Sequence, residues 1–324
     1  MRRRVGLAAA VIVPLLALGG LVLLITRGGN PLAPRTYPAP PAGKPVHATL
    51  PVRKYLGVYE PGAPESYAPV AKFSQATRVN PDIVLYYSSW WKPFQVRFAD
   101  QAHAHDATPF VQMIPSGKGV SISRLINGQY DNYIKTFAGE VRDWRYPVII
   151  SFAPEADGYW YQWGWTRIPA SEWVQAWKHV VNDFRAEGAG NVIWLWTMNR
   201  STATSRRVGP FRDYWPGKHY VNWVGIDGYY DNRAEDFNVV FGWSIGQIQK
   251  FTHAPILISE TAVGPAAGPS KIPQLFAGVR KWNLLGLVWF DKDQHHPPVR
   301  QDWRVEDSPA ALAAFRKAAQ GYVR

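Results

Sequence analysis

The sequence predicts a (β/α)₈ barrel, an α/β fold in which eight parallel strands close into a cylinder covered by helices. Short apolar runs alternate with amphipathic segments from Tyr55 onward, and eight such units fit into about 270 residues, which is typical of this barrel. A doubly wound open sheet is the alternative, and it would require a glycine-rich phosphate turn after its first strand. The segment GVYEPGAPE after Leu56 is not such a turn, so the barrel is favoured.

The first 50 residues differ in composition from the rest. Arginines at 2–4 precede an uncharged stretch, residues 5–26, which as a helix is just long enough to cross a bilayer. We therefore predict a transmembrane anchor or signal peptide over residues 1–27, with everything after it outside the cytoplasm. An uncleaved anchor in the cell membrane is favoured because no A-x-A-like cleavage site follows; cleavage would make the protein secreted. Residues 28–50, rich in Pro, Ala and Gly, predict a semi-extended linker, and residues 51–324 form the barrel domain.

The predicted strands are short and almost wholly apolar, as expected for parallel strands buried on both faces. They are residues 55–59, 83–87, 109–113, 148–152, 192–197, 223–226, 256–258 and 287–290.

Helical spacing of apolar residues is clearest on both sides of the fourth strand. One stripe contains Tyr130, Tyr133, Phe137, Val141 and Trp144, and precedes the strand. A second follows it, opening at Ser171 and closing at Gly188, and contains Trp173, Trp177, Val180 and Phe184. The pair Ser308-Pro309 is typical of a helix start and predicts a final helix.

Two predicted strands share one pattern, an apolar run that leads to a glutamate. Residues 148–152 lead to Glu155, and residues 256–258 lead to Glu260. In a barrel, both carboxyls would face one another at the C-terminal mouth, where one can act as nucleophile and the other as acid/base in retaining glycoside hydrolysis. The alternative is that Glu155 is a loop carboxylate and Glu260 a salt-bridged residue of the barrel rim.

Aromatic and polar side chains accompany these glutamates and are our candidates for substrate binding. Trp160 and Trp163 follow Glu155, where sugar rings can stack on indoles and where a carboxyl pKa is raised by apolar surroundings. A phenol at Tyr229 would stabilise a neighbouring carboxylate. The other strand ends supply Tyr59, Trp90, Asn199, Asp227 and Trp289. The alternative for these aromatic residues is a structural place in the core or at the rim.

Composition excludes several other classes of protein. There is no cysteine, so neither disulfides nor thiolate metal sites are available. Six of the basic residues lie in the first 50 positions, which contain no acidic residue, so the net charge of +12 falls to +6 for the rest and no dense basic run indicates nucleic-acid binding. Asp291, Asp293 and the pair His295-His296 are interpreted as a polar loop, and we predict no metal and no cofactor. We expect a monomer whose partner is a polysaccharide.

Three motifs, in order and with matching spacing, resemble glycoside hydrolase family 26, whose best-known members are endo-β-1,4-mannanases. Residues 154–163, PEADGYWYQW, are similar to the family signature HEMNGxWYPW; residues 224–229, VGIDGY, and 258–260, ISE, resemble its sixth and seventh strands. The resemblance covers most of residues 50–310. It implies a retaining β-glycosidase with Glu155 as acid/base and Glu260 as nucleophile, Tyr229 bonded to the nucleophile, and Trp160 and Trp289 lining the sugar subsite at the cleavage point.

The sequence departs from this family beside the acid/base. Pro154 stands where the family has histidine, and proline has neither a side-chain donor nor a backbone N–H. Three hypotheses remain open: a membrane-anchored endo-glycosidase acting on mannan, xylan or mixed-linkage glucan; a non-catalytic polysaccharide-binding or envelope-assembly protein; and an enzyme that remodels the envelope glycan of its own cell.

Overall fold

The computed structural model describes residues 50–51, 53–201, 210–294 and 301–322. The predicted membrane segment, residues 1–27, lies outside this set, as do residues 28–49 of the predicted linker and the histidines at 295 and 296. Within the described residues, none of the helices combines the length and the apolar composition needed to cross a bilayer.

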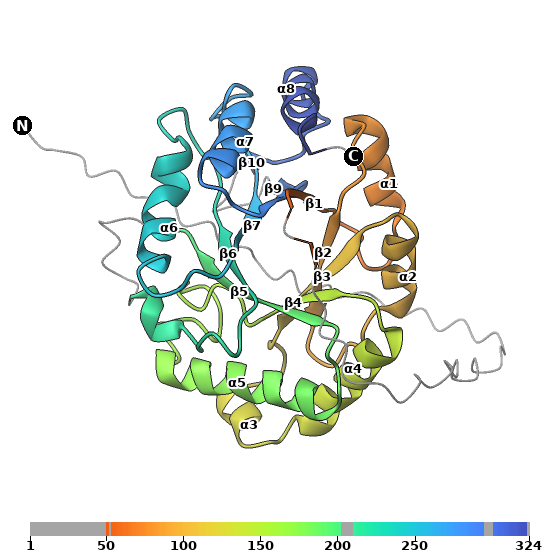
Figure 1. The fold of residues 1–324 in the computed structure, drawn as a ribbon, viewed down its shortest axis with the longest axis vertical. Helices are drawn as coiled ribbons and strands as arrows, with labels where there is room; N and C mark the ends of the chain where they lie inside the picture. Colours follow the sequence, from red (N-terminus) through yellow and green to blue (C-terminus); the bar gives the residue numbers. More distant parts are fainter. Residues whose placement is uncertain (1–49, 52, 202–209, 295–300, 323–324) are drawn as a thin grey trace, which may run out of the picture.

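Eight parallel strands form a closed barrel in which each strand pairs with the next and β1 pairs with β8 (Figure 1). The barrel prediction is confirmed, and the open-sheet alternative is wrong. The strands are β1 (Tyr55–Tyr59), β2 (Ile83–Ser89), β3 (Thr108–Ile114), β4 (Val148–Phe152), β5 (Val192–Asn199), β6 (Trp223–Asp227), β7 (Ile256–Thr261) and β8 (Gly286–Phe290). A two-residue antiparallel pair, β9 (Asp293–Gln294) and β10 (Gln301–Asp302), follows β8.

Helices surround the barrel and cover its outer face (Figure 1). They are α1 (Ala68–Thr77), α2 (Val96–Ala104), α3 (Ile122–Ile126), α4 (Asp131–Trp144), α5 (Ala170–Ala186), α6 (Trp243–Ile248), α7 (Lys271–Lys281) and α8 (Pro309–Ala319), with a 3₁₀ turn at Phe211–Tyr214 and a π turn at Asn238–Gly242.

The three helices that the sequence predicts are all present. Helix α4 contains the first apolar stripe apart from Tyr130, which is its N-cap residue. Helix α5 contains the second stripe and begins one residue before Ser171. Gly188 ends the turn after α5 with φ of 75°, a conformation that favours glycine. The Ser308 side chain accepts a bond from Ala311 N at the start of α8, with Pro309 as its first residue.

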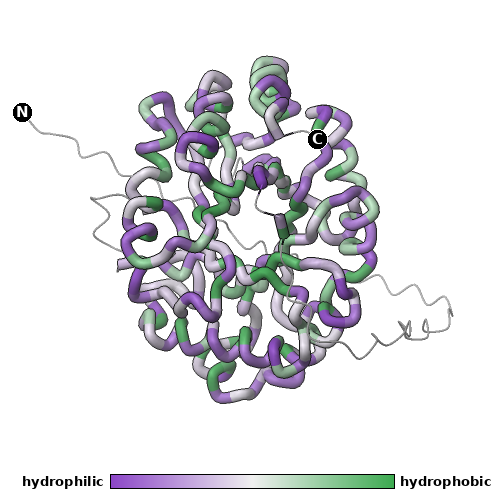
Figure 2. The backbone as a smooth tube through the Cα atoms, in the orientation of Figure 1, coloured by the Kyte–Doolittle hydropathy of each residue, from purple (hydrophilic) through white to green (hydrophobic). Residues whose placement is uncertain are grey.

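The core lies in the strands and in the helix faces turned toward them. Figure 2 shows hydrophobic segments concentrated in the ring of strands and hydrophilic ones on the outer helix surfaces and in loops. The barrel interior also contains a small polar layer, in which Ser151 Oγ donates to Thr197 Oγ1 at 2.9 Å. Gly225 of β6 belongs to this layer: a Cβ atom there would come within 2.5 Å of Ser259 Oγ, so the close approach requires glycine.

Candidate active site

Glu155 lies in a tight turn directly after β4. Ala153 and Glu155 have φ of 44° and 53°, in the left-handed region that non-glycine residues rarely adopt. Neighbouring strands hold this turn, because Ala153 N donates to Met113 O at 2.9 Å and Glu155 N donates to Thr197 O at 3.0 Å. Unfavourable backbone conformations that persist under such constraint are typical of functional sites.

Two nitrogen donors bond to the Glu155 carboxylate at the barrel mouth. Asn199 Nδ2, at the end of β5, donates to Oε1, and Trp160 Nε1 donates to Oε2 at 3.2 Å. The turn between Glu155 and Trp160 needs glycine at position 158, since a Cβ atom on Gly158 would lie 2.5 Å from the Trp160 ring. Burial, and then the negative charge of Glu260, raise the pKa of Glu155 to about 8.

Glu260 lies in β7 where the strand register is irregular. The pairing of β7 with β6 shifts between Ile226 and Asp227, and its pairing with β8 shifts between Ile258 and Thr261. Adjacent residues of a regular strand point to opposite faces, yet Ser259 donates to Asp227 Oδ1 while Glu260 also points into the barrel. The irregularity therefore directs the Glu260 carboxylate into the mouth.

Three neutral donors from three strands converge on the Glu260 carboxylate. Tyr87 Oη of β2 and Gln112 Nε2 of β3 donate to Oε1 at 2.6 and 2.7 Å, and Tyr229 Oη, just after β6, donates to Oε2 at 2.8 Å. Burial raises the pKa of Glu260 above its ordinary value, and these three donors and the charge of Lys292 offset only part of that rise. The donors favour the ionised form, which is the form a nucleophile needs.

Several predicted substrate-binding residues lie beside the two glutamates. Trp160 and Asn199 are partly exposed and bonded to Glu155, and Tyr229 is bonded to Glu260. Tyr59 stacks on Phe290 with ring centroids 4.7 Å apart. Asp227 is fully buried beneath the mouth, where burial and then the charge of Glu260 raise its pKa well above the usual range.

Two predicted sugar-binding tryptophans are corrected by the structure. Trp289 is 1% exposed, and its ring packs edge-on against Phe315 of α8 at 5.1 Å, because it alternates along β8 with Phe290, which faces Tyr59 and Tyr229. Trp163 is also 1% exposed, stacking on Tyr161 at 4.3 Å and donating to Pro154 O at 2.7 Å. Both stabilise the frame of the site and offer no face to a sugar.

Trp90 is the third correction. Its side chain is 4% exposed, with its ring against Tyr133 at 4.8 Å and against Phe152 at 6.2 Å. The neighbouring Trp91 is 54% exposed and packs edge-on against Tyr133 at 5.2 Å. The exposed indole at the end of β2 is thus one residue later than predicted, because Trp91 adopts φ of 71° and turns away from the core.

Four residues of the site are absent from the predicted catalytic and substrate-binding set: Tyr87, Gln112, Lys292 and Asp157. Asp157 Oδ1 accepts from Asn199 N at 2.9 Å and so anchors the Glu155 loop to β5. A glutamine within the apolar run PFVQM is a signal that could have identified Gln112, since a buried amide requires a partner. Tyr87 ends an apolar run and carries no comparable signal.

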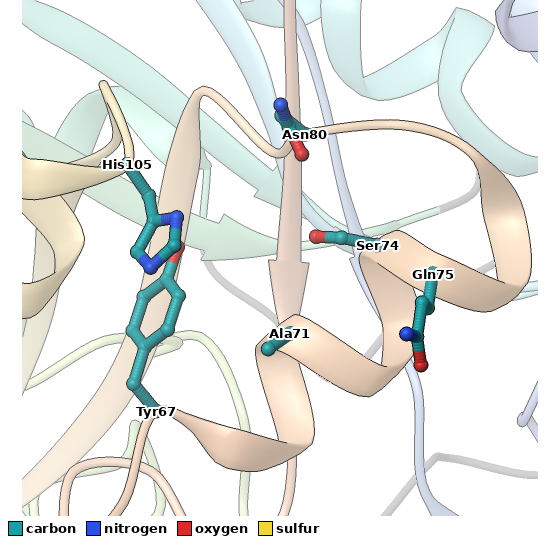
Figure 3. A pocket seen from close by; sticks show the side chains of 6 residues that line it. All are labelled: Tyr67, Ala71, Ser74, Gln75, Asn80 and His105. Atoms are coloured by element: carbon teal, nitrogen blue, oxygen red, sulfur yellow. The ribbon is translucent and has the colours of Figure 1, made fainter.

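A separate surface hollow lies in the helix layer, beside α1 and the end of α2 (Figure 3). The Tyr67 and His105 rings stack in it with centroids 4.7 Å apart. The residues that line it are Tyr67, Ala71, Ser74, Gln75, Asn80 and His105. None is a carboxylate and none belongs to a strand end, so this hollow is not part of the site described above.

The mouth therefore combines a carboxyl with a raised pKa, suited to donating a proton, and a second carboxylate held by three donors. The first can act as an acid, and the donors around the second favour the charged form that a nucleophile needs. The two groups are near enough for the charge of Glu260 to raise the pKa of Glu155.

Comparison with known proteins gives consistent matches. A protein-family model described as glycosyl hydrolase family 26 matches residues 88–295, more than half of the chain. Endoglucanase H of Acetivibrio thermocellus is 28% identical over 275 residues, covering 79% of this chain and 29% of that protein. A β-1,3-xylanase from Vibrio sp. is 28% identical over 106 residues, covering 32% of this chain and 22% of the xylanase. The chain thus spans less than a third of the length of these curated relatives.

Solved structures match in fold. The catalytic domain of the family 26 endo-β-1,4-mannanase from Bacillus sp. JAMB-750 aligns with a TM-score of 0.63 at 14% identity, over 83% of this chain and 86% of the mannanase chain.

Proposed function

The chain belongs to glycosyl hydrolase family 26, and on this premise we propose that it is a retaining endo-glycosidase that hydrolyses a β-linked polysaccharide by double displacement. Glu260 attacks the anomeric carbon and forms a glycosyl-enzyme while Glu155 protonates the departing oxygen. Glu155 then removes a proton from a water molecule as its oxygen attacks the anomeric carbon. The bond to Glu260 breaks, and the sugar leaves with its original configuration.

The observation that carries this proposal is the different surroundings of the two glutamates. Glu155 has a pKa raised to about 8 and so holds a proton at neutral pH, as an acid must. Glu260 accepts bonds from Tyr87, Gln112 and Tyr229, which stabilise its charge. These are the two roles that double displacement assigns to a pair of carboxyls.

The choice of polymer is a separate proposal. The proteins similar to this chain include a β-1,3-xylanase and a β-mannanase, which favours a β-linked polysaccharide such as mannan, xylan or mixed-linkage glucan. A membrane tether, as the arginines and apolar stretch of residues 1–26 indicate, favours a polymer near the cell, including an envelope glycan. N-terminal sequencing of the mature protein tests the tether, since a terminus near residue 35 would mean a cleaved signal peptide and a secreted enzyme.

A product-release screen tests the activity. The full-length chain is incubated with plant polysaccharides and with cell-envelope glycans, and released reducing ends are measured. Release from one polymer, with retained anomeric configuration by NMR, is the expected result. Inverted products would contradict the double displacement.

A non-catalytic polysaccharide-binding protein is the second candidate, and Pro154 favours it. Its carbonyl accepts the Trp163 N–H, but the residue brings no side-chain donor to the substrate side of Glu155. Binding on a glycan array without product from any polymer would support this candidate over the enzyme.

A further inference from the structure

Three carboxylates meet at the seam where the first and last strands of the barrel pair. Glu60 follows β1, Asp291 follows β8, and Glu306 lies in the segment before α8. Their ligand oxygens all lie within 4.8 Å of one another. Glu60 and Asp291 are buried and Glu306 is half-buried, so solvent does little to screen their mutual repulsion.

The backbone fixes Asp291 in this cluster. Asp291 N donates to Tyr59 O at 2.9 Å, which joins the two strand ends. Its Oδ1 accepts from Trp289 Nε1 at 3.1 Å and from Val305 N at 2.8 Å. Its Oδ2 receives no hydrogen bond from an N–H or hydroxyl donor of the described residues, although the residue is fully buried, and Oε2 of Glu306 is likewise buried without such a donor. Their available partners are the other carboxyls of the cluster, with which they can share a proton. Buried oxygens without partners are costly, and such atoms call for a ligand.

No side-chain cation of the described residues forms an ion pair with Glu60, Asp291 or Glu306. The charges of Lys72 and Arg304 only partly offset the effects that raise the pKa of Glu60, and Arg304 is paired with Asp302 and Asp307. Burial raises the pKa of Glu60 to about 8 and that of Asp291 well above its usual range. Protons therefore neutralise part of the cluster, and a bound divalent cation would displace them and supply the positive charge that three converging carboxylates require.

We propose that Glu60, Asp291 and Glu306 bind a divalent cation of the Ca²⁺ type. Ca²⁺ prefers carboxylate oxygens at roughly 2.4 Å, so ligands on opposite sides of it are about 4.8 Å apart and all three groups can reach one ion. The ion would link the ends of β1 and β8 to the segment that leads into α8, next in sequence to Tyr59 and Phe290 of the mouth. This differs from our sequence-based expectation of no metal, which considered Asp291 only with Asp293 and the two histidines.

A second acidic cluster provides a contrast. Asp131, His179 and Asp183 also lie within ligand distance of one another, on α4 and α5. There His179 Nε2 contacts Asp131 at 2.8 Å and Asp183 at 3.4 Å, and all three residues are half-buried. Asp183 Oδ2 is also buried without a hydrogen-bond partner, but here an imidazole lies against both carboxylates, which the cluster of Glu60, Asp291 and Glu306 lacks. This second cluster therefore serves as the matched control.

The test is thermal unfolding of the full-length chain after treatment with EDTA and dialysis, with and without added CaCl₂. We expect the Tm to rise by roughly 5–10 °C at a Ca²⁺ concentration about 100 times Kd, because an ion that binds only the folded state stabilises it. Isothermal titration calorimetry should give one Ca²⁺ per chain. An unchanged Tm would overturn the proposal.

Variants locate the site. Glu306→Gln keeps the shape of a half-buried side chain and removes one ligand charge, so it should fold and lose most of the Ca²⁺-dependent rise in Tm; Asp291→Asn should do the same. Asp183→Asn, in the control cluster, should retain the full rise. If Ca²⁺ raised the Tm of Glu306→Gln as much as that of the wild type, the ion would bind elsewhere and the assignment would be refuted. Because Tm is the readout, the result is independent of glycosidase activity.

Discussion

The ends of β4 and β7 look alike in sequence and differ in the folded protein. Each is an apolar run that leads to a buried glutamate, but Glu155 leaves its strand through a left-handed turn and accepts from Asn199 and Trp160. Glu260 remains within β7, at a register shift, and accepts from Tyr87, Gln112 and Tyr229. The difference teaches that the hydrogen-bond partners, and not the local sequence, decide which carboxyl is stabilised as an acid and which as a charged nucleophile.

The largest expected effect is the loss of kcat/KM when either glutamate is replaced. The two losses should differ on a substrate with a good leaving group. Glu260→Gln should lower kcat/KM by about 10⁴-fold or more on every substrate, since no nucleophile remains. Glu155→Gln should lower it by roughly 10²–10⁴-fold on polysaccharide but much less on an aryl glycoside, whose leaving group needs no acid. Steady-state kinetics of both variants on both substrates measure this. Equal losses on the aryl glycoside would mean that the roles are not divided as proposed.

A smaller effect on kcat is expected when one of the three hydrogen-bond donors to Glu260 is removed. Tyr229→Phe removes one of three bonds to Glu260, and a bond to a charged group contributes about 1.5–3 kcal/mol, so kcat should fall by roughly 10- to 100-fold. Tyr130→Phe is the control, because its hydroxyl donates to Gly119 O, away from both glutamates. If kcat in Tyr229→Phe matched the control, Tyr229 would have no part in stabilising the nucleophile.

The raised pKa of Glu155 predicts how activity depends on pH. Above about pH 8 the acid loses its proton, so kcat/KM on polysaccharide should fall by about tenfold per pH unit. On an aryl glycoside this alkaline limb should be weaker, and it should be absent in Glu155→Gln. If Glu155→Gln still lost activity at alkaline pH with the same midpoint as wild type, the titrating group would be a residue other than Glu155.

The raised pKa of Glu155 also makes the free energy of unfolding depend on pH. Between the usual value of 4.5 and about 8, folded Glu155 keeps its proton while the unfolded chain loses it. Since the folded state then binds more protons, raising the pH through this window lowers the free energy of unfolding. Glu155→Gln should therefore gain in Tm relative to wild type between pH 5 and pH 8. A difference in Tm that stays constant with pH would contradict the raised pKa.

The smallest effect separates two tryptophans that look equivalent in sequence. Trp160→Ala should raise KM by roughly three- to tenfold through lost stacking. Trp289→Phe should leave KM unchanged and lower Tm, because its N–H bonds to Asp291 and to Trp303 O are lost at about 1–3 kcal/mol. A raised KM in Trp289→Phe would instead place this indole in contact with the substrate.

The sequence alone determined the barrel and the position of its two glutamates. Alternation of apolar runs with amphipathic segments is a local property, and each run became a strand, with β1 and β4 matching at both ends. The strand-to-glutamate pattern is local as well, which is why the sequence was enough to select Glu155 and Glu260. The predicted membrane segment is also local, and stays a prediction.

Only the tertiary structure decided what surrounds these glutamates. Tyr87 and Gln112 are paired residues of the neighbouring strands β2 and β3, whereas Tyr229 follows β6 and Glu260 lies in β7. These two groups, far apart in sequence, meet because the barrel closes. The direction of a side chain changes with one residue of register, so Trp289 packs on α8 while Phe290 reaches the mouth, and Trp91 is exposed where Trp90 was expected. Closure and register depend on contacts across the whole domain, and a local pattern of residues cannot encode them.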